Sequence, residues 1–155
     1  MRFLTVLHLN EKEKQELIEL WNTVYPDVLQ FKSLYEFEKY LSKLKDLKHT
    51  LLFDKNNNIK GWFADFSRNN ERWFIMMVSS ELQGQGYGSR LLDEAKKKFN
   101  ELNGWVICEH EYKRKDGKPY QSPVSFYEKN DFMLYPDIIF ETDVLKTVKM
   151  QWVRN

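Results

Sequence analysis

Three alternating glycines stand between an apolar run and an amphipathic segment in the middle of the chain. Trp73–Ser79 is almost continuously apolar, which predicts a strand covered on both faces. Gln83–Gly88 follows, and then Leu91, Leu92 and Ala95 recur at helical spacing. Glycines let the backbone approach a ligand closely, and the first N–H groups of a helix have no partner within the helix. The arrangement predicts an anion such as a diphosphate held at the helix N-terminus.

The spacing of the glycines separates this segment from two other nucleotide-binding motifs. A P-loop ends in Gly-Lys-Ser/Thr, whereas Gly88 is followed by Ser89 and Arg90. The dinucleotide fingerprint G-x-G-x-x-G belongs after a first strand, whereas Gly84, Gly86 and Gly88 alternate and lie mid-chain. The P-loop is therefore excluded and a dinucleotide fold is disfavoured, while a plain glycine-rich connector remains an alternative.

The order of the expected elements is strand, two helices, three strands, helix, strand, helix and two strands. A strand, the glycine segment, a helix and the next strand form a crossover, so those two strands should be parallel neighbours. The flanking hairpins are antiparallel. We therefore predict one domain spanning residues 1–155, with an α/β (α+β) mixed sheet, mostly antiparallel with one parallel pair, and helices on both faces. The expected strands are 3–8, 50–53, 59–66, 73–79, 105–109, 138–141 and 148–153.

Capping residues locate the helices. Asn10 with Glu13, and Ser33 with Glu36, have the spacing of capping pairs, which predicts helices over 11–24 and from residue 34 to about 44. The helix after the glycines is expected to continue to Leu102, with Asn103-Gly104 as its C-cap. Ser122-Pro123 is expected to open a short helix that runs through Lys129.

Composition and charge exclude several classes of function. Apolar residues make up 42% of the 155 residues, and the net charge is +1, so neither nucleic-acid binding nor membrane binding is indicated. No apolar run approaches the roughly 20 residues that span a bilayer. The single cysteine, Cys108, excludes an internal disulfide and multi-cysteine metal sites, and it suits a reducing cytoplasm. We therefore expect a cytoplasmic protein without a metal.

Two motifs together resemble the GNAT acyltransferase superfamily. Gln83, Gly86 and Gly88 match its Q/R-x-x-G-x-G/A signature at the start of a helix. Phe126–Phe132, with the sequence FYEKNDF, is similar to the later family segment F/L-Y-E-K-x-G-F, one strand further along the chain. The order of strands and helices also matches, so the resemblance covers nearly the whole chain.

The resemblance implies direct transfer of an acetyl group from acetyl-CoA, as cosubstrate, to a primary amine of a small molecule or peptide. Met77 and Val78 would align the pantetheine arm, and Tyr127 takes the position of the general acid, because a phenol can protonate a leaving thiolate. A backbone N–H of the 77–78 stretch would stabilise the oxyanion. The implied cofactor-binding residues are Met77, Val78, Gln83, Gly84, Gln85, Gly86, Tyr87, Gly88, Ser89 and Tyr127.

The sequence departs from the family pattern near the second motif. Tyr120 and Pro123 stand where the family often has Asn and Ala, and Asp131 replaces a glycine, although Asp tolerates the left-handed conformation. The insert 112–120 is expected to reshape that side of the cleft. These departures leave a second reading open, a non-catalytic acyl-CoA-binding or sensing module on the same fold.

The general base and the acceptor pocket are less defined by the sequence. Glu109 is our first candidate for the base, because it follows a strand that should border the cleft; Glu111 and Asp65 are alternatives. The candidate acceptor residues are aromatic and belong to the segments that cover this region in the family: Trp21, Tyr25 and Trp62. Core packing is an equally good account of these aromatics. Pairing of 148–153 across a homodimer also stays open.

Overall fold

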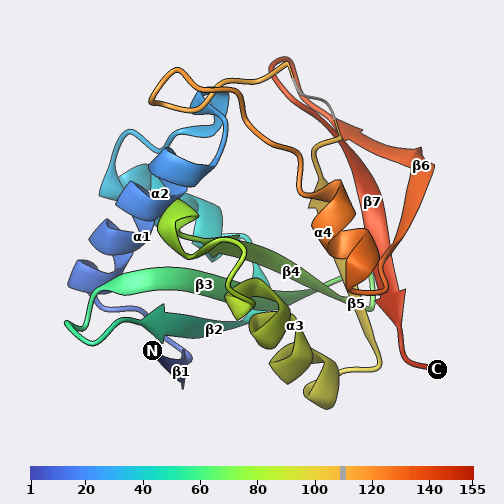
Figure 1. Cartoon of the computed structure of the whole chain (residues 1–155), viewed down its shortest axis with the longest axis horizontal. Coiled ribbons are helices and arrows are strands. Elements are labelled where there is room, and N and C mark those ends of the chain that lie inside the picture. The colour runs from blue at the N-terminus through green and yellow to red at the C-terminus, as the bar shows by residue number, and fades with distance from the viewer. Residues whose placement is uncertain (109–110) are drawn as a thin grey trace.

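The computed structural model describes residues 1–108 and 111–155, and these contain a seven-stranded sheet in the spatial order β1-β2-β3-β4-β5-β7-β6 (Figure 1). Every neighbouring pair is antiparallel except β4 and β5, which are parallel. The strands are β1 (Arg2–Val6), β2 (Lys45–Phe53), β3 (Ile59–Arg68), β4 (Glu71–Val78), β5 (Glu101–Val106), β6 (Met133–Glu141) and β7 (Lys146–Val153). The predicted mixed sheet with one parallel pair is confirmed.

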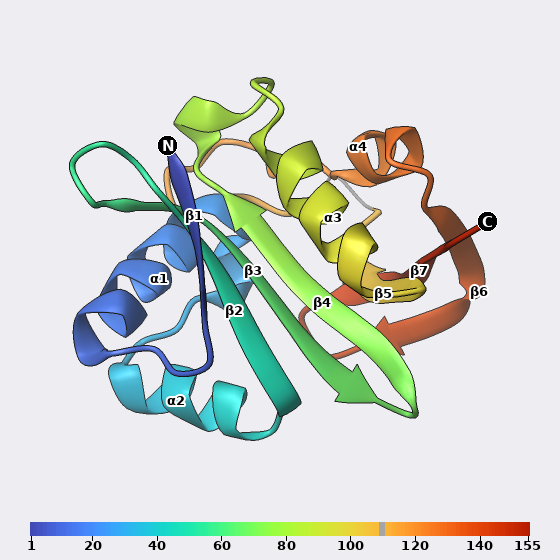
Figure 2. The ribbon, with the colours of Figure 1, turned by 90° about the horizontal axis from the view of Figure 1, so that it is seen from below.

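Helices cover both faces of this sheet (Figure 2). They are α1 (Glu11–Val24), α2 (Leu34–Ser42), α3 (Tyr87–Lys98) and α4 (Val124–Lys129). α1 and α2 pack on one face, where Leu17 and Phe37 are fully buried. α3 and α4 pack on the other, around Leu91, Leu92 and Tyr127. Within the described residues, no helix is long and apolar enough to cross a membrane.

The predicted capping pair at the start of α1 is confirmed. The Asn10 side chain accepts a hydrogen bond of 2.8 Å from the backbone N–H of Glu13, and the Glu13 carboxylate accepts one of 2.9 Å from the backbone N–H of Asn10. Ser33 caps α2 by accepting from the backbone N–H of Glu36, while the Glu36 carboxylate accepts from the backbone N–H of Lys32. These caps fix where both helices begin, and thereby where the end of α1 reaches the sheet.

The prediction for residues 99–104 is wrong, whereas Trp105 and Val106 lie in a strand as predicted. The helix ends at Lys98, and Asn103 and Gly104, expected as its C-cap, lie inside β5. Tertiary contacts decide this, because the Asn103 amide donates to the backbone carbonyl of Arg72 and accepts from the Gln151 side chain. A Cβ on Gly104 would lie 2.9 Å from Cε of Met150, so the glycine is required by close packing of the sheet.

Pairing of the last strand across a dimer is also ruled out by the topology. β7 lies between β5 and β6 and is hydrogen-bonded to both, so it has no open edge. The edge position belongs to β6, which begins five residues earlier than predicted. β2 likewise begins five residues earlier, although an irregularity near Asp46 (φ 53°) interrupts its pairing with β3.

Candidate active site

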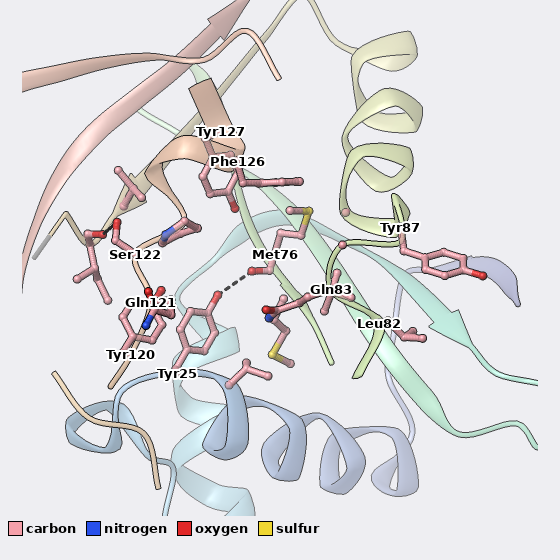
Figure 3. Close-up of a pocket in the computed structure, with 18 of the residues that line it drawn as sticks. Tyr25, Met76, Leu82, Gln83, Tyr87, Tyr120, Gln121, Ser122, Phe126 and Tyr127 are labelled. Atoms are coloured by element: carbon pink, nitrogen blue, oxygen red, sulfur yellow. Dashed lines mark hydrogen bonds between the residues drawn. The ribbon is translucent and has the colours of Figure 1, made fainter. Parts of the chain in front are cut away.

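The parallel strands β4 and β5 meet at one point and then separate. Trp73 and Asn103 are their registered pair. Beyond this pair the two strands diverge. A cavity of about 560 Å³ lies there, and helices from both faces of the sheet contribute to its walls (Figure 3). Its lining comes from the end of α1, β4, the glycine segment, β5 and the segment that leads into α4. The described lining residues are Val24, Tyr25, Met76, Met77, Val78, Leu82, Gln83, Gly84, Gly86, Tyr87, Gly88, Ser89, Trp105, Val106, Ile107, Arg114, Tyr120, Gln121, Ser122, Pro123, Phe126 and Tyr127.

The glycine segment forms a backbone cradle at one end of this cavity. Gly84 and Gly86 have φ values of 81° and 86°, which glycine adopts at little cost. Gly86 is the N-cap of α3 and offers no side chain to the helix terminus. The N–H groups of Tyr87, Gly88 and Ser89 belong to the first turn, where no helical carbonyl is available to them. Exposed donors and the helix dipole make this end suited to a phosphate group.

Gly88 is needed for a different reason. A Cβ at this position would lie 2.9 Å from Cζ of Phe126 in α4. The absence of a side chain therefore lets the start of α3 approach α4 closely. Through this contact the two family motifs recognised in the sequence meet at one wall of the cavity.

Alternation along β4 determines which backbone groups face the cavity. The N–H of Ser79 donates to Lys60 of β3, whereas the carbonyl oxygens of Arg72 and Met76 accept from groups outside β3. In an antiparallel ladder such directions alternate from residue to residue. The backbone groups of Met76 and Val78 therefore face the cavity, and those of Met77 face β3.

Tyr25 reaches the same strand from the opposite side. It is the C-cap residue of α1, and its hydroxyl donates a 2.8 Å hydrogen bond to the carbonyl oxygen of Met76 (Figure 3). Burial raises the pKa of Tyr25 well above its ordinary value, and the neighbouring hydroxyls of Tyr127 and Tyr120 raise it further. Tyr25 is therefore a proton donor at neutral pH and ties α1 to β4.

Tyr127 lies on α4 and is 6% exposed. The rings of Phe74, Phe126 and Phe132 pack around it, with centroid distances of 6.0, 5.1 and 5.4 Å. Burial raises the pKa of its hydroxyl well above the ordinary tyrosine value, with a smaller contribution from Tyr120. The phenol therefore keeps its proton at any physiological pH.

The sequence-predicted residues separate into two groups. All predicted cofactor residues except Gln85 line the cavity; the Gln85 side chain instead donates to the backbone carbonyl of Glu81. Of the acceptor candidates, Tyr25 lines the cavity, but Trp21 and Trp62 pack in the core beneath it. Trp62 is fully buried and donates to Nδ1 of His49.

Neither of the two described candidates for the general base, Asp65 and Glu111, lines the cavity. Glu109 lies outside the described residues. Asp65 is ion-paired with Arg72, and Glu111 is exposed and does not line the cavity. No cluster of three or more His, Cys, Asp or Glu side chains suited to a metal ion is found among residues 1–108 and 111–155.

Sequence reasoning missed several lining residues, among them Met76, Arg114, Gln121 and Ser122. Ser122 was expected as a helix cap, but its hydroxyl donates to the carbonyl oxygen of Ile107, with a distance of 2.6 Å, and so ties this segment to the chain following β5. For Arg114 the signal was the insert 112–120, which marked the region without identifying the side chain.

Comparison with known proteins agrees with this fold. An aminoglycoside 6'-N-acetyltransferase complexed with coenzyme A superposes with a TM-score of 0.73 at 13% identity, over 99% of this chain and 97% of the other. A spermidine N-acetyltransferase from Vibrio cholerae in complex with CoA and spermine gives 0.67 at 15% identity, over 98% and 95%. Among curated proteins, no sequence matches the chain. The model of the acetyltransferase (GNAT) domain matches residues 46–134, more than half of the chain, and the chain therefore belongs to the GNAT acetyltransferase family.

Proposed function

We propose that this protein transfers an acetyl group from acetyl-CoA directly to a primary amine of a small molecule or peptide. The observation that supports this most is that one cavity joins the glycine cradle at the start of α3 to the buried hydroxyl of Tyr127. Acetyl transfer from a CoA thioester requires a site that binds the phosphates and a proton donor for the leaving thiolate. The CoA complexes of two structural relatives support a cosubstrate of this type.

The donor end of the site is assigned to backbone groups. Residues Gln83 to Ser89 would hold the pyrophosphate through the N–H groups of the first turn of α3. Met76 and Val78 present the edge of β4 to the cavity, so they would bind an extended amide chain much as a neighbouring strand is bound. Acetyl-CoA would supply the activated acetyl thioester.

Tyr127 is assigned as the general acid. The thiol formed from a leaving thiolate has a pKa of about 8.5, whereas a phenol has a pKa of about 10. Because burial raises the pKa of Tyr127 further, the side chain is fully protonated when the reaction needs its proton. Tyr127 would donate a hydrogen bond or a proton to the sulfur as the carbon–sulfur bond breaks.

A backbone N–H is assigned to the developing negative charge on the carbonyl oxygen. The sequence indicated the 77–78 stretch, and the alternation along β4 favours Val78, whose N–H faces the cavity. Glu109 remains our prediction for the base that takes the proton from the amine, directly or through water.

A turnover experiment tests this proposal. Acetyl-CoA is mixed with the protein and a broad panel of amines, and both free thiol and acetylated amine are measured. We expect both products in equal amounts with at least one amine. Binding of acetyl-CoA without accelerated thiol release for any amine would favour the acyl-CoA-binding or sensing module instead.

A further inference from the structure

The insert 112–120 is a folded hairpin. The N–H of Tyr120 donates to the carbonyl of Tyr112 at 2.8 Å, and the N–H of Arg114 donates to the carbonyl of Lys118 at 2.9 Å. Gly117, with φ 84°, closes the turn and donates to the carbonyl of Arg114. Paired backbone groups at both ends hold the side chains of this insert in defined positions.

This hairpin is fastened to the end of α1. The N–H of Asp27 donates to the carbonyl of Lys113 at 2.8 Å, and Arg114 forms an isolated β-bridge with Pro26. Figure 1 shows the orange insert against the end of the blue helix. Because Pro26 follows Tyr25 in the chain, the bridge places Arg114 at the Tyr25 end of the cavity.

Arg114 is the positively charged residue at the Tyr25 end of the cavity. It is the one ionised side chain among the described residues that line the cavity. Its Nε atom is buried and has no hydrogen-bond partner within the described part of the chain. One of its terminal nitrogens, Nη2, pairs with the half-exposed carboxylate of Asp116 at 3.1 Å. The guanidinium therefore keeps donor capacity beyond that contact.

The position of Arg114 matters as much as its charge. In Figure 3, Tyr25 and Tyr120 lie at one end of the pocket, Tyr87 lies at the other, and Met76 lies between. The cradle at the Tyr87 end already offers backbone donors for the phosphates of the cosubstrate. The cation at the Tyr25 end is therefore available to the other substrate, together with the hydroxyl of Tyr120.

We propose that the acceptor is an amine that also carries an anionic group, a carboxylate or a phosphonate, and that Arg114 binds this group. A guanidinium pairs with both groups through charge-assisted hydrogen bonds. The charged side chain among the described lining residues is a cation, which suits an acceptor that carries an anion. This inference rests on the proposed function for its meaning in catalysis.

Matched acceptors test the inference. Amino acids with one, two or three carbons between amine and carboxylate are compared with their carboxamides and aminophosphonates, using thiol release. We expect kcat/KM to be at least about 10-fold higher for an anionic member than for its carboxamide. Equal rates within each pair, or a preference for carboxamides or polyamines, would overturn the inference while leaving acetyl transfer intact.

Substitutions in the hairpin test whether Arg114 causes the preference for anionic acceptors. Arg114→Gln should raise KM for the anionic acceptor by about 10-fold to 100-fold, with a smaller change for its carboxamide. Lys115→Gln removes an exposed charge of the same hairpin and should change neither value. Asp116→Asn frees the guanidinium and should keep the preference, whereas a purely structural role of the Arg114–Asp116 pair predicts that both substitutions act alike.

Two further readouts separate this inference from others. If Arg114→Gln weakens acetyl-CoA binding but leaves the acceptor preference unchanged, Arg114 contacts a CoA phosphate and the inference is wrong. If no amine is turned over, the proposed function fails. Thermal shifts of CoA-saturated protein with N-acetylated acids and amides then decide the inference, since a larger shift with the acids supports it and equal shifts contradict it.

Discussion

The hydroxyl of Tyr25 donates a 2.8 Å hydrogen bond to the carbonyl oxygen of Met76, joining the end of α1 to the strand that borders the cavity. These residues are 51 positions apart in the chain. The bond occupies one of the β4 carbonyl groups that face the cavity. The bond therefore limits which backbone groups of β4 remain free to form hydrogen bonds with a substrate.

Removing this hydrogen bond should lower stability. Tyr25→Phe leaves the Met76 carbonyl without this partner in a partly buried setting, which costs about 0.5 to 1.5 kcal/mol. Urea unfolding followed by tryptophan fluorescence measures the loss. Tyr35→Phe is the matched control, because Tyr35 is 71% exposed. Equal stability of the two variants would show that the Tyr25 hydroxyl contributes nothing.

Gly88→Ala should disturb the contact between α3 and α4. The new Cβ would lie 2.9 Å from Cζ of Phe126, so the Phe126 ring or one of the two helices must shift, at a cost of about 1 to 3 kcal/mol. Acetyl-CoA binding, measured by calorimetry, should weaken because the shift moves the donors of the cradle. Adding Phe126→Leu makes room and should restore part of the affinity. Unchanged affinity in Gly88→Ala would contradict the packing role.

His49 should make stability depend on pH. It is 2% exposed and accepts a hydrogen bond from Trp62, and burial, with smaller effects of His8 and Lys14, lowers its pKa from 6.5 to about 4. Between these values the unfolded chain binds the proton and the folded chain does not, so stability falls as pH falls. The loss approaches about 3 kcal/mol below pH 4.

Urea unfolding at a series of pH values checks this slope. His49→Gln keeps an acceptor for the Trp62 indole but does not titrate, so its stability should fall less steeply from pH 6.5 to about 4. The same slope in both proteins would assign the acid sensitivity to other groups.

The raised pKa of Tyr127 should affect how kcat depends on pH. Because burial raises its pKa, the acid stays protonated beyond the ordinary tyrosine value of about 10. We therefore expect kcat at saturating substrates to rise as the amine loses its proton and then to stay level up to about pH 10. A decline near that pH, absent from Tyr127→Phe, would show that the hydroxyl titrates normally.

Local signals in the sequence were sufficient for the elements that depend on neighbours in the chain. The capping pair of Asn10 and Glu13 and the left-handed Asp131 (φ 69°) are such cases. Residues 99–104 were not predictable in this way. Phe99 and Leu102 continue the helical spacing, and the strand is decided by contacts of Asn103 and Gly104 with segments far away in the chain.

The site shows the same division. The glycine cradle and Tyr127 are carried by contiguous motifs, so the sequence marks them. Trp21 and Trp62 could not be assigned, because an aromatic residue that packs in the core has the same local pattern as one in a cavity. Arg114 reaches the cavity only because the hairpin folds against Pro26, a contact between segments that no local spacing encodes.

The most direct test of the central claim compares the wild-type protein with Tyr127→Phe in thiol release and acetylated product. We predict that the substitution lowers kcat by about 100-fold to 10,000-fold, while the Kd for acetyl-CoA changes by no more than about twofold. Equal turnover by both proteins would contradict the role of Tyr127. Binding of acetyl-CoA by the wild type, without acetylation of any amine, would contradict the claim that the protein is an acetyltransferase.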